Sequence, residues 1–400
     1  MPIVIGINSK RYQAMRRRKY IIISTFCYKE KKTFINAIIF ILTGSFLLFS
    51  CVKSNNDSSS LLLLTQNGAP IHGYVYAATN LDNKIYGYSI DYTTGSLTPV
   101  GNWSTGTYPN AITANKSATF IYTANANSNT VSGFSINQST GVLTEIAGSP
   151  WSVGTKPFGV AIDPSGKFLY VANHDSNTIS GFSVDSSTGA LTAIVGSPWA
   201  TAAGPYGTAI HPSGQFLYVA NDGSSSISGF SIDSTTGVLT PIGGSPWAAG
   251  TKPTQIAIYS GNYLYASNYT SGNIYGYSIN TSTGELTSIT GSPWPAGLHN
   301  WGVTVDSNNH LYATVDNQSK VYAYSIDNST GALTASSGSP FTGSAGFGSM
   351  VDSQDRFLYT AAASSVTGYT ISASTGELTA ISGSPWAAGS GCVVLSIVNY

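Results

Sequence analysis

Short apolar runs, broken at regular intervals by polar turns, make up the chain from residue 73 onward. In the copy that starts at Pro157 the segments read PFGVAIDPSG, KFLYVANHDSN, TISGFSVDSSTG and ALTAIVGSPW. Each segment predicts one β-strand, because runs of β-branched and aromatic residues end at Asp-Pro-Ser-Gly or Ser-Thr-Gly turn sequences. The density of Gly, Ser and Thr and the lack of a long period of 3.6 residues exclude helix.

The four-strand unit recurs seven times with a period of 45 to 48 residues, which suits one blade of a β-propeller. The second strand carries a tyrosine in every copy: Tyr76, Tyr122, Tyr170, Tyr218, Tyr265, Tyr312 and Tyr359. The third strand carries an aromatic residue after a glycine or alanine: Tyr88, Phe134, Phe182, Phe230, Tyr277, Tyr324 and Tyr369. We expect that small residue to let the neighbouring sheet approach.

Two further columns follow the third strand. The next turn carries a glycine at which we expect a positive φ: Gly95, Gly141, Gly189, Gly237, Gly284, Gly331 and Gly376. The fourth strand leads into a GSPW motif, whose tryptophans we expect to pack within the blades: Trp151, Trp199, Trp247, Trp294 and Trp386.

The two ends of the repeat region predict how the ring closes. The first copy begins at its second strand, Tyr74 to Thr79, whereas the last copy is followed by CVVLSIVNY at residues 392–400, which aligns with the first strand of the other copies. We therefore predict an all-β, seven-bladed β-propeller over residues 73–400, with four antiparallel strands per blade. The C-terminal strand completes the first blade and so removes an open sheet edge.

The head of the chain has the organisation of a signal peptide. Nine of the 17 basic residues precede Cys51, and an uncharged apolar run extends from Phe34 to Ser50. The run ends in Leu48-Phe49-Ser50-Cys51, which resembles the lipobox of bacterial lipoproteins, except that Phe49 stands where a small residue is usual. This predicts a signal peptide over 1–50, lipidation of Cys51 and a polar tether over 51–72. An uncleaved membrane anchor is the alternative.

The charge and the cysteine content limit which molecules the chain can bind and whether it can form a disulfide. From Cys51 onward the chain has eight basic and sixteen acidic residues, a formal charge of −8, so we expect no nucleic-acid partner. If Cys27 leaves with the signal peptide and Cys51 carries lipid, Cys392 has no partner for a disulfide. We expect Cys392 to be a small buried residue in a strand.

The segments YVAN at 170–173 and 218–221, with the DPSG and HPSG turns before them, resemble the repeats of YVTN-type propellers. The wider resemblance is to the lactonase-like seven-bladed propeller family, which includes 6-phosphogluconolactonases. That resemblance implies histidine, glutamate and arginine around a central cleft. Here Glu145, Glu285 and Glu377 fall at the predicted outer rim, and Arg356 is expected to be a solvated turn residue, so no catalytic residue is carried over from the family.

Candidate ligand-binding residues gather on the face that carries the loops after the second and fourth strands. The aligned position at the start of the first strand is occupied by Asn110, Phe158, Tyr206, Thr254, Trp301 and Phe347. The loops after the second strand supply His174, Asp175, Asp222 and Asp316. This predicts a ring of aromatic and small polar groups at the channel mouth, on which a sugar or a peptide side chain could stack. Plain steric filling of a narrow axis is the alternative.

His174 and His299 are the histidines expected on this face, and they are the catalytic candidates if the chain is an enzyme. A histidine beside an aspartate is more often a loop hydrogen bond than a base or a metal ligand. The sequence contains no metal-ligand, nucleotide-binding or nucleophile motif in a fitting context, so we expect no cofactor and no metal.

These observations predict an envelope-anchored binding or scaffold module, held to the membrane by its lipid, whose partner is a protein, peptide or glycan at the loop-rich face. A lactonase-like hydrolase in the periplasm is the alternative reading. A purely structural envelope component without a specific ligand is a third, because a propeller fold does not fix function.

Overall fold

The structure is a computed structural model that describes residues 21–26, 36–41, 73–343 and 346–399. The chain divides into two compact units, Met1–Gln66 and Asn67–Tyr400. In the first unit, β1 (Ile21–Phe26) and β2 (Asn36–Ile41) form a two-stranded antiparallel sheet. Cys51, the rest of the predicted signal peptide and the tether lie outside the described residues. No helix in the described ranges is long and apolar enough to cross a membrane.

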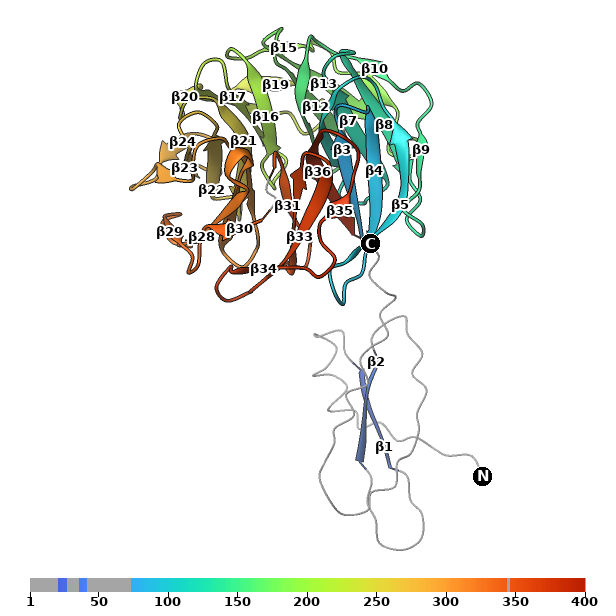
Figure 1. Cartoon of the computed structure of the whole chain (residues 1–400). Helices are drawn as coiled ribbons and strands as arrows, with labels where there is room; N and C mark the ends of the chain where they lie inside the picture. Colours follow the sequence, from blue (N-terminus) through green and yellow to red (C-terminus); the bar gives the residue numbers. More distant parts are fainter. Residues whose placement is uncertain (1–20, 27–35, 42–72, 344–345, 400) are drawn as a thin grey trace, which may run out of the picture. The chain divides into compact units, whose positions relative to one another are not determined.

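The second unit is a ring of seven antiparallel sheets, the blades, which confirms the predicted fold (Figure 1). Blade 1 has the order β36 (Cys392–Asn399), β3 (Gly73–Thr79), β4 (Lys84–Ile90) and β5 (Leu97–Ser104). Blade 2 consists of β6 (Pro109–Ala114), β7 (Phe120–Asn125), β8 (Thr130–Ile136), β9 (Leu143–Glu145) and β10 (Trp151–Ser152). Blade 3 consists of β11 (Pro157–Ile162), β12 (Phe168–Asn173), β13 (Thr178–Val184), β14 (Leu191–Ala193) and β15 (Trp199–Ala200). Blade 4 consists of β16 (Pro205–Ile210), β17 (Phe216–Asn221), β18 (Ser226–Ile232), β19 (Leu239–Pro241) and β20 (Trp247–Ala248).

Blade 5 consists of β21 (Pro253–Tyr259), β22 (Tyr263–Asn268), β23 (Asn273–Ile279), β24 (Leu286–Ser288) and β25 (Trp294–Pro295). Blade 6 consists of β26 (Asn300–Val305), β27 (His310–Val315), β28 (Lys320–Ile326), β29 (Leu333–Ala335) and β30 (Phe341–Thr342). Blade 7 consists of β31 (Ser349–Val351), β32 (Phe357–Ala362), β33 (Ser365–Ile371), β34 (Leu378–Ala380) and β35 (Trp386–Ala387). The 3-10 turn η1 (Asp316–Gln318) follows β27. In blades 2 to 7 the outer strand is split into a three-residue piece and a two-residue piece, which both pair with the third strand.

The first strands are innermost, and they contact one another in turn around the axis: β36, β6, β11, β16, β21, β26 and β31. The core is correspondingly divided into seven clusters, each formed by the facing surfaces of two neighbouring blades. The loops after the second and fourth strands share one end of the ring, here named the loop face. The turns after the first and third strands share the other end, the turn face.

Ring closure follows the prediction from the chain ends. β36 pairs with β3 along its length, with Tyr76 opposite Ser396 and Gly73 opposite Asn399. Figure 1 shows the red C-terminal strand beside the blue first strand of the repeat region. Cys392 lies fully buried at the start of β36 and has a free thiol, and burial raises its pKa to about 12. This buried position agrees with the sequence prediction.

The tyrosine of each second strand ties its blade to the next one. In six of the seven blades its hydroxyl donates a hydrogen bond of 2.7 Å to the carbonyl of the turn glycine that follows the third strand of the next blade, from Tyr76 to Gly141 through to Tyr359 and Gly95. All seven turn glycines have a positive φ, between 68° and 77°, as predicted. The last of these bonds joins blade 7 to blade 1.

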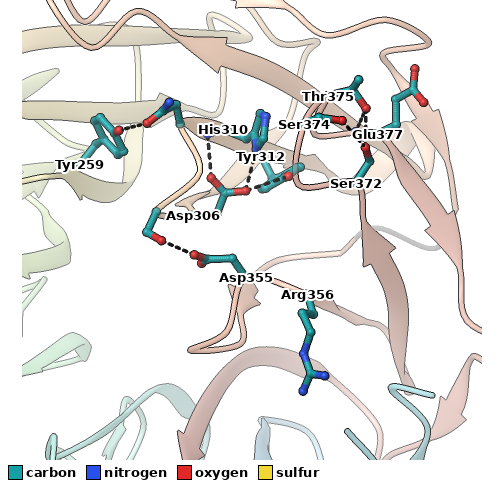
Figure 2. Close-up of polar contacts among 12 residues, drawn as sticks. Tyr259, Asp306, His310, Tyr312, Asp355, Arg356, Ser372, Ser374, Thr375 and Glu377 are labelled. Atoms are coloured by element: carbon teal, nitrogen blue, oxygen red, sulfur yellow. Dashed lines mark hydrogen bonds and ion pairs between the residues drawn. The ribbon is translucent and has the colours of Figure 1, made fainter. Parts of the chain in front are cut away.

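Blade 6 uses a different arrangement, because His310 takes the place that Phe168 has in blade 3 (Figure 2). The His310 Nδ1 lies 2.8 Å from a buried Asp306 carboxylate oxygen, and the Tyr312 hydroxyl donates to the same oxygen at 3.2 Å. The His310 ring packs on Gly376 of blade 7, where an added Cβ would lie 2.7 Å from it. A buried polar network therefore replaces the tyrosine-to-glycine bond at this junction.

The small residue of the third strand serves its own blade and not the neighbouring one, so that part of the sequence prediction was wrong. A Cβ added at Gly181 would lie 2.5 Å from the ring of Trp199, and at Gly133 it would lie 2.8 Å from Trp151. The indole of each GSPW motif thus packs against the glycine of the third strand of the same blade. This agrees with the predicted packing role of the tryptophans.

We expect Tyr122→Phe to lower the free energy of unfolding by about 1–3 kcal/mol, because it leaves the buried Gly189 carbonyl without its donor while keeping the ring. Urea denaturation of the purified propeller measures the change. Tyr275→Phe is the matched control, since the Tyr275 hydroxyl makes no hydrogen bond within the described part of the chain, and it should shift stability by less than about 0.5 kcal/mol. Equal losses in both variants would contradict a special role for the inter-blade bond.

Candidate functional site

The predicted ligand-binding residues lie where the innermost strands begin at the loop face. In six blades the pairing of the first and second strands shifts register at this point, for example between Pro157 and Gly159. A bulge of this kind re-aims side chains at the end of a strand. It accounts for the clustering of Phe158 and its counterparts near the axis.

Glycines next to these aromatic residues let the innermost strands approach each other closely. A Cβ at Gly159 would lie 2.0 Å from the carbonyl oxygen of Tyr206, and one at Gly207 would lie 2.2 Å from that of Thr254. No other residue fits there without moving the backbone. The sequence pairs Phe158-Gly159 and Tyr206-Gly207 therefore combine a ring at the axis with contact to the next blade.

Four of the predicted residues form a continuous aromatic cluster, defined here as Phe158, Tyr206, Trp301 and Phe347. Successive ring centroids are 4.9, 5.6 and 5.4 Å apart. Tyr206 reaches towards blade 2, where Asn110 Nδ2 donates to its hydroxyl at 3.1 Å. Burial raises the pKa of the Tyr206 phenol, which is therefore neutral. All four residues are half-buried, so part of each stays accessible.

Thr254 occupies the aligned position in blade 5 but is withdrawn from the surface, which corrects its place among the ligand-binding candidates. Its side chain is buried, with the residue only 3% exposed. Its hydroxyl is 2.8 Å from the Trp301 carbonyl oxygen and 3.1 Å from the Ser267 hydroxyl. Thr254 thus holds blades 5 and 6 together, and Tyr206 and Trp301 meet beside it.

His174 lies at one side of the aromatic cluster, between two carboxylates. Its Nδ1 is 2.7 Å from Asp175 Oδ1, and its Nε2 is 3.0 Å from Asp222 Oδ1 of the next blade. Its ring meets Phe158 edge to face, with centroids 5.0 Å apart. The hydrogen bond to Asp222, followed by that to Asp175, raises the His174 pKa above its usual 6.5, although partial burial opposes the shift. The two hydrogen bonds therefore favour the charged imidazolium over the neutral ring.

Lys156 pairs with Asp175 next to His174, and it was not among the residues predicted from the sequence. Its Nζ is 3.2 Å from Asp175 Oδ2. The hydrogen bond from His174, with Lys156 adding to it, lowers the pKa of the Asp175 carboxyl. Lys156 and His299 occupy the same aligned position, one residue before the first strand, and both have a positive φ. That shared position is the signal by which Lys156 could have been found.

A second histidine–aspartate pair lies at the other side of the cluster. His299 Nδ1 is 3.3 Å from Asp316 Oδ1, and the His299 ring stacks on Tyr269 with centroids 4.5 Å apart. The Trp301 Nε1 donates to Asp316 Oδ2 at 2.9 Å. The structure thus brings together His174 with Asp222 and His299 with Asp316, residues that are distant in sequence.

The other charged residues lie elsewhere. Glu145, Glu285 and Glu377 are exposed at or beside the outer strands, as expected. Arg356 is at the turn face, and its guanidinium lies over Tyr92 of blade 1 at 4.9 Å and over Phe357 at 5.2 Å. The prediction of a solvated turn side chain was therefore wrong, because Arg356 packs across the junction of blades 7 and 1.

Two hollows of about 290 Å³ each open at the turn face. One is lined by Asn115, Lys116 and Ser117 with the 164–166 turn, and the other includes Asp306. Their central polar groups are already engaged, because Asn115 bonds Ser117 and Thr119 and Asp306 bonds His310. In the described ranges no group of three or more His, Cys, Asp or Glu side chains could hold a metal ion. The candidate site therefore lies at the loop face, where the two histidine–aspartate pairs are partly exposed.

The family model described as "Lactonase, 7-bladed beta-propeller" matches residues 53–154, 147–205 and 196–298, and the chain belongs to this family. This confirms the resemblance inferred from the repeat motifs. No curated protein matches the sequence.

Solved structures share the fold. A candidate 6-phosphogluconolactonase from Bacteroides uniformis has a TM-score of 0.72 at 16% identity, over 82% of this chain and 99% of that chain. The periplasmic gluconolactonase of Pseudomonas aeruginosa has a TM-score of 0.71 at 14% identity, over 82% and 99%. A protein from Lactobacillus plantarum gives 0.69 at 16% identity, over 82% and 99%. At such identities these structures are evidence for the fold alone.

We expect Asp222→Asn to lower the His174 pKa more than Asp175→Asn does, because the Asp222 hydrogen bond is the larger cause of its elevation. NMR titration of the His174 imidazole measures both shifts. The elevated pKa also links to folding: the pair adds stability that is complete below pH 6.5 and is lost as the pH rises through the folded-state pKa. An unchanged His174 pKa in Asp222→Asn would contradict the geometry.

Proposed function

We propose that the propeller is a lactone hydrolase whose acid–base pair is His174 and Asp222. The observation that carries the proposal is the 3.0 Å contact between His174 Nε2 and Asp222 Oδ1, at the edge of the aromatic cluster. Both side chains stay accessible, with 25% and 19% of their surfaces exposed. Membership of a lactonase family favours hydrolysis over the binding or scaffold role that the sequence alone predicted.

In the proposed reaction, a water molecule adds to the lactone carbonyl carbon and gives a proton to the Asp222 carboxylate. The ring C–O bond then breaks, and the charged His174 donates a proton to the leaving alkoxide. Transfer of the Asp222 proton to His174 restores the pair. One lactone and one water become one hydroxy acid, which releases a proton on ionising. Positioned acid–base groups of this kind contribute about 10²–10⁴-fold to the rate.

The surrounding residues have supporting parts in this proposal. The Phe158 and Tyr206 rings limit water on one side of the pair, which strengthens its electrostatics. Asp175 orients the imidazole from Nδ1 and is itself balanced by Lys156. The arginine that the family resemblance implies has no counterpart here, because the described arginine, Arg356, is at the turn face.

We expect the propeller to open five- and six-membered lactones faster than the buffer blank, measured by proton release at constant pH. Asp222→Asn and His174→Gln should each lower kcat/KM by about 10²-fold or more. Glu285→Gln, an exposed carboxylate near the outer rim, is the matched control and should leave the rate unchanged. Activity should also fall as the pH rises through the elevated His174 pKa, since the imidazolium is the proton donor.

Thermal unfolding of each variant separates loss of chemistry from loss of fold. If the wild-type rate equals the blank across the lactone panel, the proposal fails. It also fails if Asp222→Asn, folded normally, keeps more than about half of the activity.

We infer further that the chain is a lipoprotein of the bacterial cell envelope, anchored through Cys51. The basic head, the apolar run to Ser50 and the lipobox-like Leu48-Phe49-Ser50-Cys51 support this. Metabolic labelling with an alkyne fatty acid should mark the wild type and not Cys51→Ala. Cys392→Ala is the control and should keep the label, because its thiol is buried in β36. Label that persists in Cys51→Ala would exclude this attachment.

A further inference from the structure

The four rings of the aromatic cluster come from four blades, and the fold does not require them. They occupy the aligned position at the start of the innermost strands in blades 3, 4, 6 and 7. Blade 2 has Asn110 at this position and blade 5 has Thr254, so the same backbone accepts a polar side chain. Contiguous apolar side chains that stay partly accessible mark a contact surface for another molecule.

The hydrogen-bonding groups of this surface are engaged within the protein. The Trp301 indole N–H donates to Asp316 Oδ2 at 2.9 Å, and Asp316 Oδ1 is buried. The Tyr206 hydroxyl accepts a hydrogen bond from Asn110 Nδ2 at 3.1 Å. The two phenylalanine rings of the cluster have no polar atoms. A hydroxylated group that rests on the four rings would therefore lose its water without gaining partners, whereas an apolar group would not.

The cluster begins at the proposed acid–base pair. The Phe158 ring meets the His174 ring edge to face at 5.0 Å, and the Tyr206 ring meets it at 6.4 Å with an interplanar angle of 90°. From Tyr206 the cluster continues to Trp301, with centroids 5.6 Å apart, and then to Phe347 at 5.4 Å. A lactone whose ester group lies at His174 can therefore lay a substituent along these rings.

The charges beside the cluster are already balanced by one another. His174 lies between the carboxylates of Asp175 and Asp222, and Lys156 is paired with Asp175. A charged substituent on the ligand would have to displace one of these pairs to find a partner. The pairing therefore favours a substituent without charge.

From these contacts we infer that the aromatic cluster is a subsite for an uncharged, apolar substituent, so that the substrate class is an alkyl- or aryl-substituted lactone. The inference rests on the proposed lactone hydrolysis and adds its specificity. His174 and Asp222 act on the ester, while the substituent packs on Tyr206, Trp301 and Phe347.

The test compares kcat/KM of the full chain for γ-valerolactone, γ-octalactone, γ-decalactone and glucono-1,5-lactone, each divided by the rate of the same lactone in buffer. We expect about a twofold gain for each added methylene group, because each group leaves water on half-buried rings. γ-Decalactone should then exceed γ-valerolactone by about tenfold or more, and glucono-1,5-lactone should stay well below γ-decalactone.

Phe347→Asn tests the subsite directly, since it places in blade 7 the residue type that Asn110 supplies at the same position in blade 2. It should lower kcat/KM for γ-decalactone by about fivefold or more and that for γ-valerolactone by less than about twofold. Phe347→Leu should keep part of the preference, because it keeps an apolar side chain beside Trp301. Val195→Ser is the matched control, since Val195 lies between β14 and β15 and is 89% exposed. It should leave both rates unchanged.

Calorimetry with the stable analogue 5-hexylpyrrolidin-2-one, the lactam that corresponds to γ-decalactone, measures binding apart from hydrolysis. A higher relative rate for glucono-1,5-lactone than for γ-decalactone overturns the substrate class. Equal relative rates along the γ-lactone series, with no selective effect of Phe347→Asn, overturn the subsite but leave lactone hydrolysis standing. Lactam binding that Phe347→Asn weakens, with no lactone opened, supports the apolar subsite and removes the proposed hydrolysis. Neither lactam binding nor lactone opening overturns both.

Discussion

A single buried hydrogen bond, repeated around the ring, sets the frame on which everything else depends. The tyrosine hydroxyl of one blade reaches the turn glycine of the next, and each bond satisfies a carbonyl that would otherwise be buried without a partner. The glycine supplies the positive φ that turns its carbonyl towards the donor. Tyr359 and Gly95 join blade 7 to blade 1, and the His310–Asp306 network with its contact to Gly376 lies at the junction of blades 6 and 7, so all seven blades are coupled around the axis.

The candidate site uses positions that this frame leaves free. The start of the innermost strand provides close backbone contact and, in six blades, a bulge, but its side chain can be asparagine, threonine or an aromatic ring. Blades 3, 4, 6 and 7 place rings there, and the adjoining loops add histidine and aspartate in blades 3, 4 and 6. A sevenfold scaffold thereby carries an asymmetric surface, with acid–base groups at one side of the rings and a stacked platform at the other.

Much of the fold could be predicted from the sequence because its signals are repeated. The tyrosine and glycine that recur in every copy predicted the number of blades. The first copy, which begins at Tyr74, lacks its first strand, and the extra strand at 392–400 after the last copy predicted how the ring closes. The role of the third-strand glycine was predicted wrongly. A recurring glycine does not show whether the space beside it is filled by a side chain of the same blade, such as Trp199, or by the neighbouring blade. The exchange of Phe for His310 was equally hidden, because its partner Asp306 also occupies an ordinary turn position.

The site was predictable in part. The aromatic ring of residues followed from alignment, since Phe158, Tyr206, Trp301 and Phe347 share one position. The contact between His174 and Asp222 could not be predicted from the alignment, because it depends on how far one blade is rotated relative to the next. Thr254 occupies the same aligned position as these aromatic residues, yet its small side chain is buried, and its hydroxyl donates a hydrogen bond to the Trp301 carbonyl oxygen. Sequence position thus gave the neighbourhood of each side chain but not its direction.

The pairing of Gly73 with Asn399 decides from which end of the ring the upstream chain departs. Second strands start at the turn face, so the polypeptide enters the propeller there, at the pole opposite to His174 and Trp301. The loop face, with His174 and Trp301, is therefore the end of the ring farthest from Gly73, and the strand pairing that closes the ring keeps the first described residue of the propeller away from the acid–base residues.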